Sequence, residues 1–219
     1  MKKTILFLFA LLWVSGATMA QQAQVERRSK IPFAYKDFKD GNIEFAFGKD
    51  KIYKANIFLK DASLLYKNDT TVMKANLFGV ISVDFGDALY HKTGDRMGKV
   101  IEQKGEVFLT VVTTIDTDRM REDARSGRNS TFLDLPEFNL FIDTNADYWA
   151  EGEGSSWPLK DEYFFVVKGE AIPAAEKIVK KSIRADKRND FKELMKNRKW
   201  SWKDANSLKV LVDYFRTDK

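Results

Sequence analysis

The sequence contains no cysteine and a single histidine, His91. Without cysteine the chain forms no disulfide, offers no thiolate nucleophile and builds no thiolate zinc site. A Ser-His-Asp triad would have to use His91, and no serine lies in the glycine pattern of a nucleophile elbow. The glycine-rich phosphate loop and the dinucleotide-binding fingerprint are absent too. These absences argue against catalysis, and we interpret His91 as an ordinary residue at a strand end.

Long hydrophobic runs are missing after the first 20 residues. Lys2 and Lys3 precede an apolar run from Ile5 to Val14, and small residues follow up to Ala20. This order is typical of a secretory signal peptide, whose apolar core is shorter than the roughly 18 residues of a membrane span. We therefore expect a signal peptide at 1–20, cleavage near Ala20, export to the periplasm or cell surface, and no transmembrane segment in the mature chain.

The net charge of +5 is distributed unevenly along the chain. Residues 177–203 include 11 basic and 3 acidic residues, whereas residues 21–176 include 21 basic and 26 acidic ones. The basic C-terminal region is expected either to attract an anionic partner or to pack on the acidic body. Export argues against nucleic acid as that partner. Lipopolysaccharide phosphates, anionic glycans or an inner-leaflet surface are the remaining anionic candidates.

Short segments with a period of two residues recur between turn signals through most of the chain. Ile43, Phe45 and Phe47, for example, alternate with more polar neighbours, which is typical of a half-buried strand. The pattern predicts antiparallel strands at 42–48, 52–59, 62–67, 71–76, 78–85, 88–91, 96–103, 106–115, 137–143 and 161–168. The charged segment 116–129 is predicted to be an exposed loop, and 144–160 a long connection.

From Pro173 the period changes to about 3.6 residues, which indicates helices. An amphipathic helix is predicted at 173–184, and a second at 187–199 with Asp186 as its N-cap. A third is predicted to begin with Ser201 as its N-cap, Asp204 at the third helical position and Trp200 in a hydrophobic staple. Its buried side would carry Leu208, Leu211, Val212 and Phe215.

These elements predict an α+β fold. The β-rich body, 21–172, is expected to be an antiparallel sandwich or an open barrel of about ten strands, because both architectures close a sheet over one apolar face. Two to three helices in the C-terminal region, 173–219, are expected to pack on this body.

The chain resembles a loosely defined group of uncharacterised exported proteins from Gram-negative anaerobes. The likeness lies in a leading strand pair, 37–43 and 52–57, in the segments 80–87 and 98–102, and in a final helix with Lys203, Leu208, Leu211 and Tyr214. It covers most of the mature chain. The resemblance implies an exported β body with a lysine-rich helical end, and it implies no activity and no site residues.

Three sets of residues are candidate sites. Asp143, Asn145 and Asp147 open like a calcium-binding loop, but Tyr148 and Gly154 stand where an EF-hand needs glycine and glutamate, which leaves an irregular calcium site or a solvated acidic turn. Aromatic residues of the 144–160 connection form either a platform for sugar rings or an anchor for the loop; these are Tyr148, Trp149 and Trp157. The cationic side of the first helix contacts an anionic surface or faces solvent, and it comprises Lys177, Lys180, Lys181 and Arg184.

The function expected from these observations is that of an exported, non-catalytic accessory or binding protein of the cell envelope, with an envelope protein or a glycan as its partner. One alternative is a glycan-binding or glycan-hydrolysing protein that uses the 144–160 loop, although no spacing singles out a catalytic carboxylate pair. Another alternative is a carrier of a lipid or small ligand, which predicts a large apolar cavity inside the β structure. No cofactor is expected, apart from calcium if the acidic loop binds it.

Overall fold

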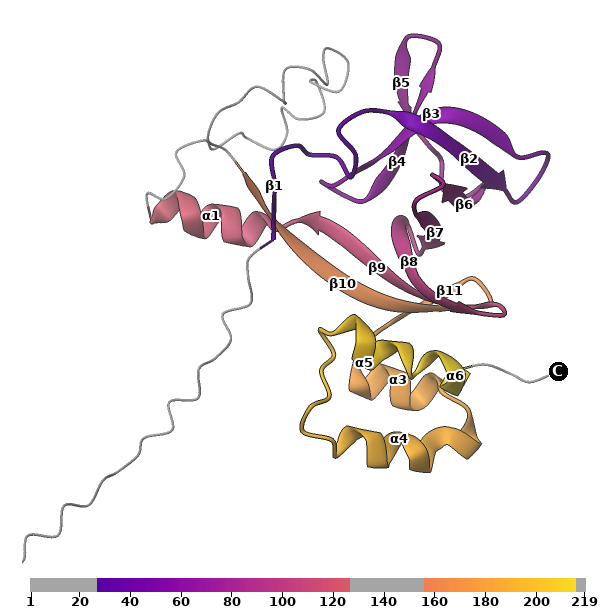
Figure 1. The fold of residues 1–219 in the computed structure, drawn as a ribbon, viewed down its shortest axis with the longest axis vertical. Helices are drawn as coiled ribbons and strands as arrows, with labels where there is room; N and C mark the ends of the chain where they lie inside the picture. Colours follow the sequence, from indigo (N-terminus) through magenta and orange to yellow (C-terminus); the bar gives the residue numbers. More distant parts are fainter. Residues whose placement is uncertain (1–26, 127–155, 216–219) are drawn as a thin grey trace, which may run out of the picture.

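The computed structural model describes residues 27–126 and 156–215, and the strands in this part of the chain form one antiparallel sheet (Figure 1). Ten of the eleven strands follow the spatial order β1-β10-β9-β8-β7-β6-β2-β3-β4-β5, and β11 pairs with β10. Their bounds are β1 (Arg28–Ser29), β2 (Lys39–Phe45), β3 (Lys51–Phe58), β4 (Ser63–Asn68), β5 (Thr71–Lys74), β6 (Val80–Asp84), β7 (Leu89–Thr93), β8 (Arg96–Lys104), β9 (Val107–Ile115), β10 (Trp157–Val167) and β11 (Glu170–Pro173).

The sheet consists of two meanders joined by one non-sequential pairing. Strands β2 to β5 pair in chain order, and so do β6 to β10. The join is between β2 and β6, where Ile43 lies opposite Val83. The sheet curls into an open half-barrel, so the open barrel, rather than the sandwich, describes this body.

Most helices lie at the C-terminal end and cover β8, β9 and β10 from the side opposite β2 to β5 (Figure 1). Val107, Leu109 and Phe165 of the sheet form one buried cluster with helical residues such as Phe191 and Leu211. The helical bounds are α1 (Thr117–Arg125), α3 (Glu176–Ser182), the 3-10 helix η2 (Ala185–Lys187), α4 (Arg188–Met195), α5 (Ala205–Lys209) and α6 (Val212–Phe215). None of the helices described is long and apolar enough to cross a membrane. The predicted α+β class with an antiparallel β body and C-terminal helices is confirmed.

The predicted loop at 116–129 is wrong for its first part, because α1 occupies Thr117–Arg125. The Asp116 carboxylate accepts a hydrogen bond from the amide of Arg119 at 3.0 Å, which satisfies a free donor in the first turn. Ion pairs three residues apart, such as Arg119 with Glu122, support the exposed side. A short helix of this kind is stabilised by capping, ion pairs and packing on the sheet. It has no long apolar stripe from which it could be predicted.

The predicted helix starts in the C-terminal region also need correction. Asp204, rather than Ser201, caps the last helical segment, since its carboxylate accepts hydrogen bonds from the amides of Asn206 and Ser207. Asp186 does not cap the second helix, because its carboxylate is bound by Arg184 and α4 begins only at Arg188, after η2. Both errors arise because an aspartate near a helix start can accept hydrogen bonds either from backbone amides of the helix or from a neighbouring side chain. The predicted buried side is correct: Leu208, Leu211, Val212 and Phe215 are all in the core.

Two further boundaries differ from the prediction. In the first C-terminal helix, Val179 is buried as expected, but Ile178 is 41% exposed, and Ile183 beyond the helix is buried instead. Strand β10 starts at Trp157, so the end of the predicted 144–160 connection belongs to the sheet. The strand predicted at 137–143 lies outside the described residues.

Candidate ligand cavity

The curled sheet lines a cavity of about 600 Å³ that is open to solvent and has a size in the range of small-molecule sites. It lies on the concave side of the half-barrel, where β3, β7, β8, β9 and β10 contribute side chains together with β1 and the segment that follows it. Its apolar lining residues are Phe33, Ala34, Ile57, Leu59, Met97, Ile101, Val111 and Leu159. Its polar lining residues are Arg27, Arg28, Ser29, Tyr90, Lys99 and Thr113.

Strand register explains why a lysine faces this cavity. Tyr90 lies opposite Lys99, Lys99 lies opposite Val111, and Val111 lies opposite Tyr163. Directly opposed residues in an antiparallel sheet project from the same face, so these four side chains form one row across β7, β8, β9 and β10. Tyr90, Lys99 and Val111 of this row line the cavity, whereas Tyr163 packs against the helical cluster, and the Lys99 side chain is exposed.

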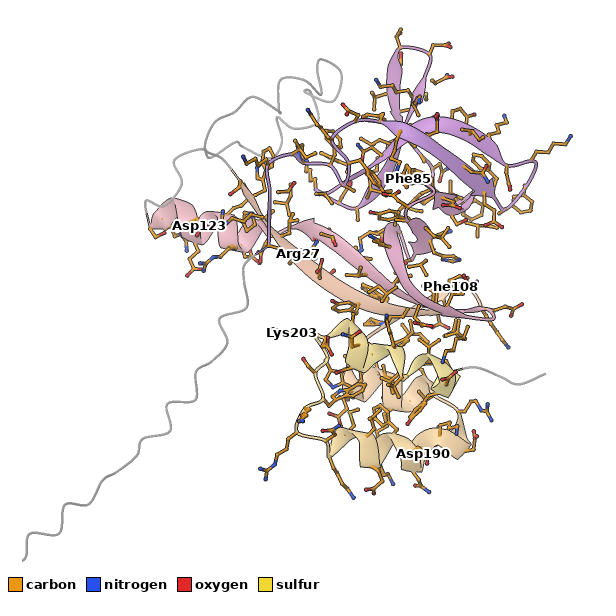
Figure 2. The ribbon with its side chains drawn as sticks, in the orientation of Figure 1. Arg27, Phe85, Phe108, Asp123, Asp190 and Lys203 are labelled. Carbon is orange, nitrogen blue, oxygen red and sulfur yellow. The ribbon has the colours of Figure 1, made fainter. Side chains whose placement is uncertain are left out.

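The arginines at the cavity are each bound to a carboxylate. Arg27, which immediately precedes β1 and is labelled in Figure 2, donates to Asp161 of β10. Asp161 also accepts a hydrogen bond from Thr113 at 2.6 Å. Arg28 donates to the buried carboxylate of Asp123 on α1. Among the described residues Lys99 has no ion-pair partner, so it is the cation of this cavity whose charge the protein does not neutralise.

An aromatic network fixes the position of Tyr90. The Tyr90 ring meets Phe85 edge to face with centroids 5.7 Å apart, and Phe85 contacts Tyr35 at 4.9 Å. Tyr35 donates a hydrogen bond to Asp87 at 3.2 Å, and Lys39 donates to the same oxygen at 2.7 Å. Burial raises the pKa of Tyr90 above its usual value. The phenol is therefore protonated at neutral pH and can donate a hydrogen bond to a ligand.

The cavity combines an extended apolar wall with one uncompensated ammonium group and a neutral phenol donor. An apolar wall favours a hydrocarbon surface, and the exposed ammonium group of Lys99 at its edge favours an anion. A molecule with both parts, an amphiphilic acid, satisfies the wall and Lys99 at the same time. This arrangement can bind and orient such a molecule.

His91 lies on β7 outside the cavity lining. Its ring stacks on Phe108 with centroids 4.3 Å apart, and its Nδ1 is 2.8 Å from the carbonyl oxygen of Lys92. Burial lowers the pKa of His91 below its usual value. In the described part of the chain, no group of three or more histidine, aspartate or glutamate side chains is placed to hold a metal ion.

The predicted calcium ligands Asp143, Asn145 and Asp147 lie outside the described residues, and so do Tyr148 and Trp149 of the predicted aromatic platform. Trp157 is described, and it is only 4% exposed. It packs in a core cluster with residues such as Leu59 and Ile115. The burial of Trp157 favours the reading of this residue as an anchor over its reading as part of a platform for sugars.

The predicted cationic side of the first C-terminal helix is only partly assembled. Lys177, Lys180 and Lys181 line an open groove of about 620 Å³ together with Glu176 and Arg188. Arg184 does not join them, because its Nε and Nη2 donate to Asp186 at 3.0 and 2.8 Å. Arg188, the first residue of α4, is the arginine that lines the groove instead.

Sequence reasoning missed Lys99, Tyr90 and Arg27. A signal for Lys99 was present: it alternates in phase with Met97 and Ile101, which places a lysine on the apolar side of its strand. The contribution of Arg27 had no such signal, because β1 consists of only two residues.

Comparisons with protein families, with curated proteins and with solved structures find no match to this chain. The fold is a half-barrel of antiparallel strands with a C-terminal helical cover. Function is therefore argued from the chemistry of the site alone.

Proposed function

We propose that this chain is an exported, non-catalytic binding protein of the cell envelope, and that its β body carries an amphiphilic acid. The observation that supports this proposal is the uncompensated Lys99 ammonium group beside the apolar wall of the cavity. The order of charged, apolar and small residues at 1–20 supports export.

The apolar wall and Lys99 make separable contributions to this binding. Each buried CH₂ of a ligand contributes about 0.8 kcal/mol, which is offset in part by the entropy lost on association. Because Lys99 is exposed, a hydrogen bond from it to a carboxylate competes with water and contributes about 0.5–1 kcal/mol, or about twofold to fivefold in affinity. A charged probe and an uncharged probe with the same chain distinguish the two contributions.

Dodecanoate and dodecanol are such a pair, and isothermal titration calorimetry measures their binding to the mature chain. The Lys99→Met variant keeps the unbranched stem of the lysine and removes its charge. We expect this variant to bind dodecanoate about twofold to fivefold more weakly than the unaltered protein does, and to bind dodecanol equally well. Lys192→Met, which removes an exposed lysine of α4, is the matched control and should change neither affinity.

The Val111→Trp variant tests whether the probes occupy the cavity, since a tryptophan beside Lys99 fills it. This variant should lose both probes while circular dichroism and the melting temperature show that it is folded. Binding of dodecanoate that is unaffected by both substitutions, or no binding of dodecanoate to the unaltered protein, would contradict the proposal.

A second candidate function rests on the groove of Lys177, Lys180, Lys181 and Arg188. In the described part of the chain none of these four cations has an ion-pair partner, which favours contact with a phosphate-bearing envelope component such as lipopolysaccharide. Reversal of all four to glutamate should abolish sedimentation with lipopolysaccharide if the groove is a binding surface. Unchanged sedimentation would leave these residues as a solvated face.

The glycan-binding alternative now depends on Tyr148 and Trp149, because Trp157 is buried. A glycan array with a Trp149→Ala control tests it, and absence of binding by both forms would count against it. The calcium alternative depends on Asp143, Asn145 and Asp147, and calcium titration of an Asp143→Asn, Asp147→Asn variant is the corresponding test.

A further inference from the structure

One end of the half-barrel exposes large apolar side chains. Phe47 is 83% exposed and Phe78 is 80% exposed, and Ile52 in the adjoining strand is exposed as well. Burial of such a side chain contributes about 1.5–3 kcal/mol, so leaving several of them in water is unfavourable unless a partner covers them. This group is separate from the cavity, since none of its members lines it.

The backbone holds the two phenylalanines at the same end of the sheet. The amide of Ala46 donates to the carbonyl oxygen of Gly79 at 3.0 Å, and Phe47 and Phe78 are the next residues outward on the two segments. A turn at Asn76 fixes the second segment, because its side-chain oxygen accepts a hydrogen bond from the amide of Phe78 at 3.0 Å. These hydrogen bonds hold the exposed rings of Phe47 and Phe78 at one end of the sheet, and we call the two rings the aromatic tip.

The aromatic tip is flanked mainly by positive charge. Lys49 follows Phe47 in the turn between β2 and β3, Lys51 is the first residue of β3, and Asp50 is the acidic residue between the two lysines. The Nζ of Lys92 lies 5.9 Å from the centroid of the Phe78 ring, within reach of a cation–π interaction. In the described residues none of the three lysines has an ion-pair partner.

We infer that the aromatic tip docks this protein on the surface of an anionic lipid bilayer. Protruding apolar side chains with lysines beside them match a bilayer, whose boundary accepts aromatic and aliphatic groups next to anionic headgroups. Each lysine near such a surface contributes about 1 kcal/mol. The tip projects rather than forming a groove, so it suits a fluid layer that adapts to its shape.

The tip lies apart from the cationic groove on the C-terminal helices. Strands β2 and β3, at the upper right, lie on the far side of β8 to β10 from α3 and α4 (Figure 1). A single flat bilayer patch that contacts the tip leaves the groove free. The two surfaces can therefore be tested independently in one assay.

Flotation with vesicles of phosphatidylcholine and phosphatidylglycerol, in a ratio of about three to one, measures the docking of the mature chain. The Phe47→Ser, Phe78→Ser variant should lower the ratio of vesicle-bound to free protein at least tenfold. Because both rings face solvent, this variant should keep the melting temperature of the unaltered protein. The Lys49→Gln, Lys51→Gln, Lys92→Gln variant should bind at least tenfold more weakly to these vesicles. Added salt should likewise weaken the binding of the unaltered protein to the vesicles, because it screens the attraction between lysines and anionic headgroups.

The matched control is Lys177→Glu, Lys181→Glu, which reverses charge in the groove and leaves the tip intact; it should float like the unaltered protein. Flotation that is lost in this control but kept without the two phenylalanines would overturn the inference in favour of the helices. The inference would also be overturned if the unaltered protein did not float with the vesicles. It would likewise be overturned if the Phe47→Ser, Phe78→Ser variant still floated but lost a crosslinked protein partner.

Discussion

Arg28 of β1 donates a hydrogen bond to the carboxylate of Asp123 on α1, although the two residues are 95 positions apart in the chain. The Asp123 side chain is 4% exposed, and Arg119 lies 3.5 Å from its other oxygen. One buried carboxylate thus joins the first strand, the helix after β9 and, through β1, the start of β10. The edge of the cavity that carries Arg27 and Arg28 depends on this contact.

Replacement of Asp123 by asparagine should destabilise the protein, because it removes the charge of a buried carboxylate that Arg28 and Arg119 both contact. We expect a loss of about 2 kcal/mol in the free energy of unfolding, measured by urea denaturation. Asp118→Asn is the control, since Asp118 pairs with Arg121 on the exposed side of the same helix and should lose less than about 0.5 kcal/mol. Equal losses in the two variants would contradict a structural role for Asp123.

Replacement of Asp204 by alanine should cost about 1 kcal/mol of stability, because its carboxylate caps α5. Ser201→Ala should cost less, since the Ser201 hydroxyl accepts only the amide of Lys203 at 3.2 Å, outside the helix. Urea denaturation of both variants ranks the two residues. A larger loss of unfolding free energy for Ser201→Ala than for Asp204→Ala would support the sequence prediction that Ser201 is the N-cap.

Replacement of Gly98 by alanine should destabilise the sheet by about 2 kcal/mol through overpacking. A Cβ atom at this position would lie 2.7 Å from the Thr93 hydroxyl and 2.9 Å from the Cβ of Thr110, and both threonines are buried. Gly79→Ala is a suitable control, because no atom lies within 4 Å of the corresponding position there. The prediction fails if thermal unfolding shows the same melting temperature for both variants.

The stability of the protein should fall with acidification in part through His91. Burial lowers the pKa of His91 in the folded state, so the unfolded chain binds this proton more strongly. The contribution of the neutral imidazole is therefore complete above the unfolded pKa of about 6.5 and is lost as the pH falls below it.

His91→Gln, which does not titrate, isolates this contribution. The melting temperature of the unaltered protein relative to this variant should be highest at pH 7.5 and should decrease at pH 5.5. Acid effects on the carboxylates are common to both proteins and cancel in the difference. A difference that is constant across this range would show that His91 does not contribute.

Local patterns predicted the elements that bury one clear face. The strands at β3, β8 and β9 were found because their alternation is long, and the final helix because Leu208, Leu211 and Phe215 recur at helical spacing. The helix α1 was missed because its sequence is charged throughout, and its cap, its ion pairs and Asp123 supply the stability that a stripe would otherwise give. Strand β1 was not predicted, because a segment of two residues is too short to show an alternation of apolar and polar residues.

The fold class, the helical C-terminal end and the buried side of the final helix can be predicted from the chain alone, since they depend on the spacing of apolar residues along one segment. The pairing of β2 with β6, the position of Lys99 at a cavity and the shared exposed end of Phe47 and Phe78 are visible only in the folded protein. A period of two fixes which residues share a face of a strand. What lies across from that face depends on the curl of the sheet and on pairings between distant segments.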